Sequence, residues 1–349
     1  MSINTYLETA LSSNASDLHI VVGKPPVLRL DGELRFIDGK PLTPDDTQNM
    51  IREVMNESAY QKFQETGDAD FSFSVNALGR FRVNAYRQRG SCGMAIRIVH
   101  WRIPQMDELG LPPVAAELTR KLRGMILITG PTGSGKSTTL ASMIDLINTE
   151  RSSHIITLED PIEYLHRHNK SIVNQREVGS DTKSFSAGLR AAIREDPDVI
   201  LVGEMRDLDT ISIAVTAAET GHLVLSTLHT TGVANTVDRI IDIFPPYQQQ
   251  QIKMQLSSVL NGIISQQLVL KKSGSGRVGA FEVMVANNAV KNLIREGKTH
   301  QIQSILQTGS KIGMQTMDGA LIQHFRNGTI SRDSALTHSY DYDYIKSQL

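Results

Sequence analysis

Residues 130–138 form a run whose types and spacing suit phosphate chemistry, because they match the pattern G-x-x-x-x-G-K-[ST] in full. Its glycines let backbone N–H groups turn inward around phosphate oxygens. Lys136 can bring a positive charge to the β- and γ-phosphates, and Ser137 can offer its hydroxyl to Mg²⁺. We therefore predict a site for ATP and Mg²⁺ rather than a glycine-rich turn without a ligand. The predicted cofactor-binding residues are Gly130, Pro131, Thr132, Gly133, Ser134, Gly135, Lys136, Ser137 and Thr138.

Two glutamates are candidates for the carboxylates that nucleotide hydrolysis needs. One such carboxylate holds the metal ion, and another orients or deprotonates water. Glu163 follows shortly after an apolar run at 154–158, and Glu204 follows another at 199–202. Aspartate is usual where Gly203 stands, so the second run is atypical. Either glutamate fits the role of general base, and the alternative is that both are ordinary loop residues facing solvent.

Two histidines, His222 and His229, flank a third strand-like run. They are seven positions apart, which places them at opposite ends of a strand and excludes one shared metal site. At the carboxyl end His229 would reach the edge where ligands of parallel sheets bind, and there it would sense the γ-phosphate. A lone histidine is more often structural, and we expect His222 to be structural or at a subunit contact.

Residues 71–106 contain six arginines and no aspartate, glutamate or lysine. A solvated sheet face ordinarily mixes both signs, so charge of one sign suggests that this surface meets an anion. Guanidinium groups bind phosphates in a defined geometry, and the absence of lysine favours a few well-placed contacts. Arg82 and Arg97 are predicted to be arginine fingers on a nucleotide in their own or a neighbouring subunit, with an ordinary charged surface as the alternative.

The elements that carry these arginines belong to a first part built from short strands and turns. A helical pattern lies at 44–65, and two longer alternating segments flank residues 88–92 as the arms of a hairpin. We predict an α+β, mostly antiparallel domain. Its predicted strands are 27–30, 71–75, 80–87 and 93–99.

The phosphate-binding run belongs to a second part, in which apolar runs alternate with helical stretches. This alternation means crossover connections and a mostly parallel sheet, hence an α/β fold. The predicted strands are 125–129, 154–158, 199–202 and 223–227, followed by a hairpin around 272–276. Prolines at 104, 112 and 113 indicate a linker. We predict domains at 1–103 and 116–349, joined by a linker at 104–115.

Length and composition exclude several classes of protein. The 349 residues suffice for about two domains with buried cores. No apolar stretch approaches the ~18 residues that cross a bilayer, and the first residues do not resemble a secretory signal. A single cysteine, Cys92, excludes an intrachain disulfide and a thiolate zinc site, as expected in a reducing cytoplasm. With 36 Lys and Arg against 37 Asp and Glu, broad nucleic-acid binding is not expected.

Taken together, the motifs resemble those of the type IV pilus retraction ATPases, within the secretion ATPase superfamily. The resemblance covers nearly the whole chain. Residues 289–298 resemble the C-terminal motif of retraction enzymes, usually A-I-R-N-L-I-R-E, with Val290 and Lys291 as departures. The other matching stretches are 16–19, 23–26, 79–84, 130–138, 159–163, 194–198, 203–207 and 221–230.

The resemblance implies a PAS-like N-terminal domain, a RecA-like P-loop ATPase domain and a homohexameric ring on the cytoplasmic side of the inner membrane. The implied partners are an inner-membrane pilus platform protein and a paralogous pilus ATPase, without nucleic acid. The resemblance also implies roles for single residues. Lys136 and Ser137 bind phosphate and Mg²⁺, Glu204 binds the metal and Glu163 activates water, although the roles of the two glutamates remain exchangeable. His229 senses the γ-phosphate, and Arg82 and Arg97 are arginine fingers.

Within the superfamily, the sequence favours a motor for pilus retraction and twitching motility. Assembly and type II secretion ATPases typically have a longer N-terminal region and a four-cysteine insert, which one cysteine cannot form. The alternatives are an accessory or structural nucleotide-binding subunit of the pilus motor, and a related assembly or secretion ATPase. A nucleic-acid motor is a further alternative, because RecA-like domains occur there too.

Overall fold

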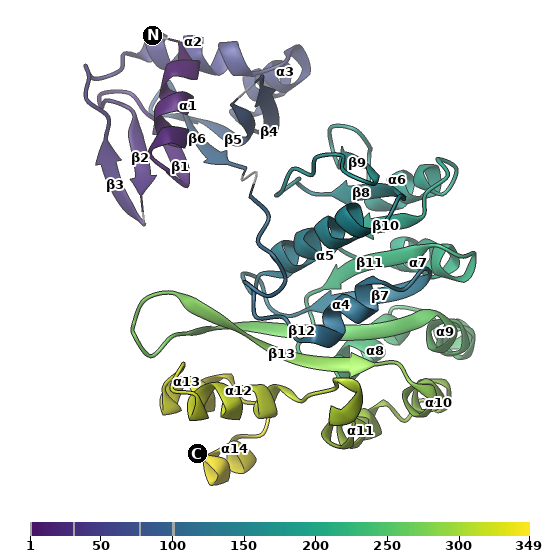
Figure 1. Ribbon diagram of the computed structural model, residues 1–349. Helices are drawn as coiled ribbons and strands as arrows, with labels where there is room; N and C mark the ends of the chain where they lie inside the picture. The colour runs from purple at the N-terminus through teal and green to yellow at the C-terminus, as the bar shows by residue number, and fades with distance from the viewer. Residues whose placement is uncertain (1, 31, 77, 100–101) are drawn as a thin grey trace. The chain divides into compact units, whose positions relative to one another are not determined.

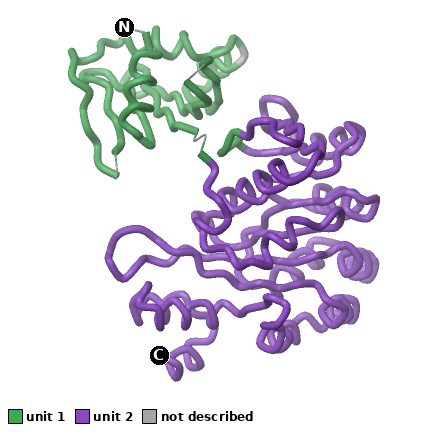
Figure 2. The backbone as a smooth tube through the Cα atoms, in the orientation of Figure 1, with its two compact units in different colours: residues 1–102, 161–165 green, residues 103–160, 166–349 purple. Residues whose placement is uncertain are grey.

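The computed structural model describes residues 2–30, 32–76, 78–99 and 102–349. The chain divides into two compact units (Figure 2). Unit 1 comprises residues 1–102 and 161–165, and unit 2 comprises residues 103–160 and 166–349. Each unit has a hydrophobic core of its own.

Unit 1 is built on a six-stranded sheet in the order β3-β2-β1-β6-β5-β4, with antiparallel neighbours throughout (Figure 1). The strands are β1 (Asp17–Ile20), β2 (Val27–Leu30), β3 (Glu33–Phe36), β4 (Asp68–Val75), β5 (Gly79–Gln88) and β6 (Ser91–Ile98). The predicted antiparallel character is confirmed. β5 and β6 form the predicted hairpin, and Arg82 lies directly opposite Arg97 in it.

Three helices pack against this sheet, namely α1 (Ile3–Ser12), α2 (Pro44–Val54) and α3 (Glu57–Thr66). The single helical pattern predicted at 44–65 is in fact two helices. Met55 is extended, and the side chain of Asn56 accepts a hydrogen bond from the Ala59 amide at 2.8 Å. Because asparagine is a strong N-cap, it begins a new helix at this point instead of continuing the first.

Unit 2 is built on a seven-stranded sheet in the order β13-β12-β7-β11-β10-β8-β9. The six strands from β12 to β9 run parallel to their neighbours, and β13 is an antiparallel edge strand, so the predicted parallel sheet is confirmed. The strands are β7 (Gly124–Thr129), β8 (His154–Glu159), β9 (Ile172–Glu177), β10 (Val199–Val202), β11 (Leu223–Leu228), β12 (Leu260–Leu270) and β13 (Arg277–Val285).

Helices cover both faces of this sheet (Figure 1). Ile126 and Ile128 of β7 pack in a core with α4 and α5, whereas Met125 and Leu127 pack in a second core with α6 to α11. Successive strand residues therefore serve opposite cores. These helices are α4 (Pro113–Thr119), α5 (Lys136–Glu150), α6 (Phe185–Ala192), α7 (Leu208–Glu219), α8 (Val233–Asp242), α9 (Pro246–Val259), α10 (Asn288–Glu296) and α11 (Ile302–Thr308).

The β12–β13 hairpin, with its turn near the predicted position, supports the C-terminal helices. Val269 and Ala280 of the hairpin form a small core with Met317 and Leu321. These contacts attach the C-terminal helices to β12, the strand that also pairs with β7. The C-terminal helices are α12 (Met317–Arg326), α13 (Arg332–His338) and α14 (Tyr342–Gln348).

Residues 104–112, most of the predicted linker, contain no helix or strand and belong to unit 2. Leu111 is buried, and the Gln105 side chain donates a hydrogen bond to Asp145 Oδ2 at 3.4 Å. The segment is thus attached to unit 2. Its role as a linker between domains stays a prediction.

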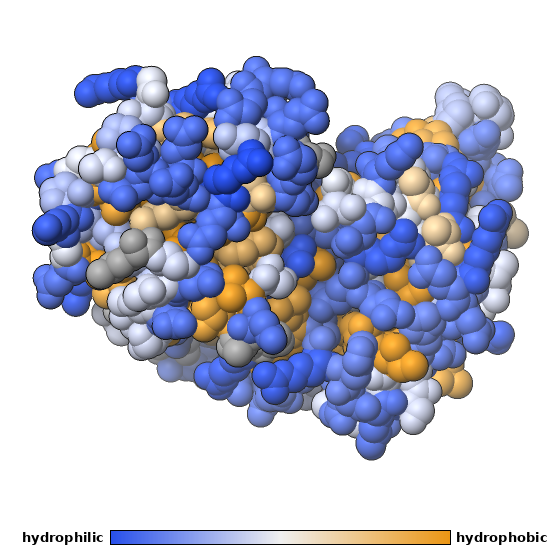
Figure 3. Space-filling model, turned by 90° about the horizontal axis from the view of Figure 1, so that it is seen from above, coloured by the Kyte–Doolittle hydropathy of each residue, from blue (hydrophilic) through white to orange (hydrophobic). Residues whose placement is uncertain are grey.

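Within the described ranges, no helix is both long and apolar enough to cross a bilayer. The face drawn in Figure 3 is mostly hydrophilic, and its hydrophobic side chains lie in small separate groups. Large exposed hydrophobic residues occur in both units, for example Phe36 in unit 1 and Leu122 and Tyr247 in unit 2.

Candidate functional site

The phosphate-binding run connects the end of β7 to the start of α5. Gly130 has φ of 140°, and a Cβ atom there would lie 2.2 Å from the backbone oxygen of Gln266, so the position requires glycine. Gly135, with φ of 88°, is the N-cap of α5 and gives the helix no side-chain cap. The loop therefore ends at a helix N-terminus whose dipole favours anions.

Lys136 lies inside this loop and is only 8% exposed. Its Nζ donates to the backbone oxygens of Gly130 at 2.9 Å and Pro131 at 3.0 Å. The Ser134 hydroxyl is buried without a hydrogen-bond partner. A buried ammonium group and a buried unsatisfied hydroxyl, side by side in one loop, fit a ligand with several anionic oxygens. The residues present thus suit the phosphates of a nucleotide.

A buried carboxamide that sequence reasoning missed braces the loop. Gln266 on β12 is 3% exposed. Its Nε2 donates to the backbone oxygen of Ser134 at 2.6 Å, and its Oε1 accepts from the Thr139 hydroxyl at 2.9 Å. One side chain therefore joins the loop to the first turn of α5. The available signal was a Gln-Gln pair inside a strand of mostly apolar residues.

Glu204 and His229 lie together next to the loop. Glu204 Oε2 is 3.2 Å from His229 Nε2, and His229 Nδ1 is 3.4 Å from the hydroxyl of Thr132. Arg206 Nε donates to the other Glu204 oxygen at 2.5 Å. The Glu204 side chain is 14% exposed, so its charge is poorly screened by water. The imidazole thus contacts both the phosphate loop, at Thr132, and Glu204, the candidate metal ligand.

This cluster forms because β10 and β11 are neighbouring parallel strands whose carboxyl ends meet at one edge of the sheet. Beyond β10, the hydroxyl of Thr227 donates to the Gly203 oxygen at 2.6 Å, and the Met205 amide donates to the Thr227 oxygen at 3.1 Å. These bonds fix the backbone on both sides of Glu204. Gly203 also has little room for a side chain, since a Cβ would lie 3.1 Å from the Leu158 oxygen.

The stretch that carries Glu163 is held at both ends by one side chain, that of Gln175 on β9. Gln175 Nε2 donates to Glu159 Oε1 at 3.0 Å, and its Oε1 accepts from the His166 amide at 2.8 Å. Burial lowers the pKa of His166 to about 4, so its ring is neutral at pH 7. Glu163, which is exposed, lies between these two anchored ends.

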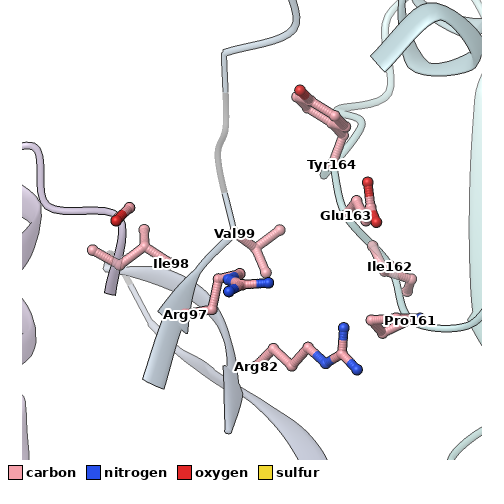
Figure 4. A pocket seen from close by; sticks show the side chains of 9 residues that line it. Arg82, Arg97, Ile98, Val99, Pro161, Ile162, Glu163 and Tyr164 are labelled. Atoms are coloured by element: carbon pink, nitrogen blue, oxygen red, sulfur yellow. The ribbon is translucent and has the colours of Figure 1, made fainter. Parts of the chain in front are cut away.

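In unit 1, Arg82 and Arg97 line a pocket of about 230 Å³ together with Glu163 (Figure 4). The two arginines project from paired positions of β5 and β6, facing the segment that carries Glu163. Arg97 Nε donates to Asp17 Oδ1 at 3.0 Å, which fixes the direction of that side chain. Both arginines are otherwise exposed, and nearby like charges favour an anion between them.

The predicted site residues therefore fall into two groups. Lys136, Glu204 and His229 lie together in unit 2, whereas both arginines and Glu163 lie in unit 1. His222 is separate from these groups: its Nδ1 lies 2.9 Å from the Ala217 carbonyl oxygen at the end of α7. The expected role of His222, structural or at a subunit contact, stays a prediction.

Known proteins resemble this chain over most of its length. The profile of the family described as "Type II/IV secretion system protein" matches residues 1–274. The "Type IV pilus retractation ATPase PilT" of Pseudomonas aeruginosa is 48% identical over 335 residues, which cover 96% of this chain and 97% of that protein. A "Twitching motility protein" of Neisseria gonorrhoeae is 46% identical over 334 residues, which cover 96% and 89%.

A solved structure is also similar. The crystal structure described as the pilus retraction motor PilT with bound ADP has a TM-score of 0.93 to this chain at 51% sequence identity. The match covers 99% of both chains. The similarity therefore includes both units and the nucleotide-binding loop.

Proposed function

Since this chain belongs to the type II/IV secretion system family, and within it to the pilus retraction ATPases, we propose that it is a homohexameric, Mg²⁺-dependent motor that converts ATP to ADP and phosphate to retract a type IV pilus. The observation that carries the catalytic part is the contact chain from Thr132 through His229 to Glu204. It places a poorly solvated carboxylate close to the phosphate loop, where a metal-binding acid of a nucleotide-hydrolysing site would lie.

In this proposal the loop residues 130–138 bind the phosphates of ATP. Lys136 exchanges its two backbone acceptors for phosphate oxygens, and the N-terminus of α5 adds its dipole. Ser137 and Glu204 hold Mg²⁺, which when bound neutralises charge on the phosphate oxygens. Few protein ligands suffice, because Mg²⁺ usually keeps waters and phosphate oxygens as its other ligands.

The remaining roles concern water and charge. Glu163 takes a proton from the attacking water, while His229 orients Glu204 and responds to the γ-phosphate. Arg82 and Arg97 stabilise the negative charge that develops in the transition state. Because the arginines and Glu163 belong to unit 1, hydrolysis is coupled to the placement of unit 1 of the same or a neighbouring subunit. A hinge at 104–115 lets the units move as sites open and close.

The proposed setting is the cytoplasmic face of the inner membrane. The partners there are a pilus platform protein of that membrane and a paralogous pilus ATPase, and nucleic acid is not a partner. Deletion of the gene in its host tests the direction of work. Hyperpiliated cells that do not twitch are expected for a retraction motor, whereas bald cells would assign the chain to pilus assembly.

Turnover measurements test the chemistry. Lys136→Ala and Glu204→Ala should each lower kcat for Mg²⁺-dependent ATP hydrolysis by about 100-fold or more, with hexamers retained. His222→Ala, outside the cluster, is the matched control and should stay within about twofold of the wild type. Robust turnover in the first two variants would overturn the site assignment. A wild-type protein that binds ATP without turnover would instead be an accessory subunit.

A further inference from the structure

A buried carboxylate, Glu282 on β13, lies beside the segment that carries His229. Glu282 is 1% exposed, and burial raises its pKa to about 7. A hydrogen bond from the backbone of Val233 opposes this rise in pKa, and the charge of Asp318 on α12 adds to it. Tyr340, between α13 and α14, is a further titratable neighbour. Burying a carboxylate beside another acid costs stability, which indicates that the group serves a purpose other than packing.

Glu282 caps a helix to which it does not belong. Its Oε2 accepts a hydrogen bond at 2.8 Å from the amide of Val233, the first residue of α8. The N-cap position is Gly232, which has no side chain to do this. Ser265, the cross-strand partner of Glu282, accepts from the Gly232 amide at 3.0 Å. The paired strands β12 and β13 thus hold two successive amides where α8 begins.

These two amides also fix the segment that precedes α8. Only three residues, 229–231, separate Gly232 from Leu228, the last residue of β11. β11 is held in the middle of the sheet, so the start of α8 is the other anchor of this short segment. His229 lies in it, between Thr132 and Glu204. A shift of the start of α8 would therefore move the imidazole away from these two partners.

We propose that Glu282 is a positioning residue for His229. It holds the first amide of α8, and thereby keeps the imidazole between the phosphate loop and Glu204. An acceptor oxygen is needed at this position because the glycine N-cap leaves the first amides of α8 without a side-chain partner of their own. The inference rests on the proposed function, in which His229 takes part in hydrolysis.

Steady-state kinetics of the full-length hexamer test this role. Glu282→Ala should lower kcat about tenfold and leave the dissociation constant for ATP within about twofold, because the amide loses its acceptor while the loop remains intact. Glu282→Gln keeps an acceptor oxygen and should recover kcat to within about threefold of the wild type. The matched control is Asn287→Ala, which removes the side-chain cap of α10 at Val290 and should leave kcat within about twofold.

A double-mutant cycle decides whether Glu282 acts through His229. In a His229→Ala background, Glu282→Ala should lower kcat no further. If Glu282→Ala does not fold, Ser265→Ala replaces it, because this variant removes the acceptor of the adjacent Gly232 amide. Ser265→Ala should lower kcat when His229 is present and should not lower it further in the His229→Ala background. Two results would overturn the inference and leave the proposed function in place. One is that Glu282→Ala lowers kcat by the same factor with and without His229. The other is that Glu282→Ala and Asn287→Ala lower kcat equally. A His229→Ala variant with full kcat would overturn the proposed role of His229 and this inference with it.

Discussion

At the scale of single residues, the shape of the phosphate loop depends on the carboxamide of Gln266. Gln266→Ala removes its bonds to Ser134 and Thr139 and leaves buried polar atoms unsatisfied. We expect ATP affinity to fall about tenfold and stability to fall by about 1–3 kcal/mol. Titration calorimetry with ATP and chemical denaturation measure these two quantities.

The neighbouring residue offers a matched control for this prediction. Gln267 has the same side chain, but it bonds to His338 near the C-terminus. Gln267→Ala should therefore lower stability by a similar amount and leave ATP affinity unchanged. Equal losses of affinity in both variants would mean that Gln266 acts only through general stability.

Glu282 also predicts a dependence of stability on pH. Its pKa is about 7 in the folded chain, against an ordinary value of 4.5. Between pH 4.5 and about pH 7 the Glu282 carboxyl keeps its proton in the folded chain and loses it in the unfolded chain. The free energy of unfolding therefore falls as pH rises through this range, by roughly 3 kcal/mol in all. Glu282→Gln should remove this loss. Chemical denaturation should find the variant more stable than the wild type at pH 8, with a smaller difference at pH 5. A difference independent of pH would contradict the assignment.

Sequence reasoning at this scale succeeds where chemistry is local. The nine residues of the phosphate loop are consecutive, and the placement of Glu204 and His229 after neighbouring parallel strands brings them together. Gln266 and Glu282 could not be predicted, because their partners are more than 45 positions away in sequence. Their polar side chains in apolar strands give a signal, but no sequence pattern identifies which backbone amide or oxygen each one contacts.

At the scale of elements, two glycines of the phosphate loop should differ in their tolerance of a side chain. Gly130→Ala would place a Cβ 2.2 Å from the Gln266 backbone oxygen at φ of 140°, and should abolish ATP binding. Gly133 has φ of 77° and open space around it, so Gly133→Ala carries only backbone strain of about 1 kcal/mol. Equilibrium binding of a fluorescent ATP analogue checks both variants, and similar losses would contradict the geometry.

Helices and strands can be predicted from the sequence where a periodic pattern of apolar residues extends over several positions. The predicted hairpin in unit 1 and the buried strands of unit 2 are present, because their apolar patterns span several residues. The four-residue strand β3 is exposed along its length, and its four residues are too few for their polar–apolar alternation to identify a strand. The break between α2 and α3 depends on Asn56, a cap that periodicity alone does not reveal.

At the scale of the whole molecule, the candidate site is distributed over both units. Residues 161–165 belong to unit 1 although the chain on either side of them belongs to unit 2. Glu163 thus groups with Arg82 and Arg97 around one pocket, while Gln175 bonds to Glu159 and His166, which flank the stretch and belong to unit 2. The chain therefore passes from unit 2 to unit 1 and back between Asp160 and His166.

If the arginines act on a neighbouring subunit, two inactive variants should complement each other in mixed rings. A subunit with Arg82→Ala and Arg97→Ala keeps its phosphate loop, and a Lys136→Ala subunit keeps both arginines. In a random equal mixture, half of the sites have an intact loop and half of those adjoin intact arginines, so about one quarter of wild-type turnover should return. Mixing Lys136→Ala with Glu204→Ala is the control and should restore nothing, because within one chain His229 joins Glu204 to Thr132 of the loop that carries Lys136. Mixed hexamers without turnover in the first pair would show that the arginines do not act across subunits.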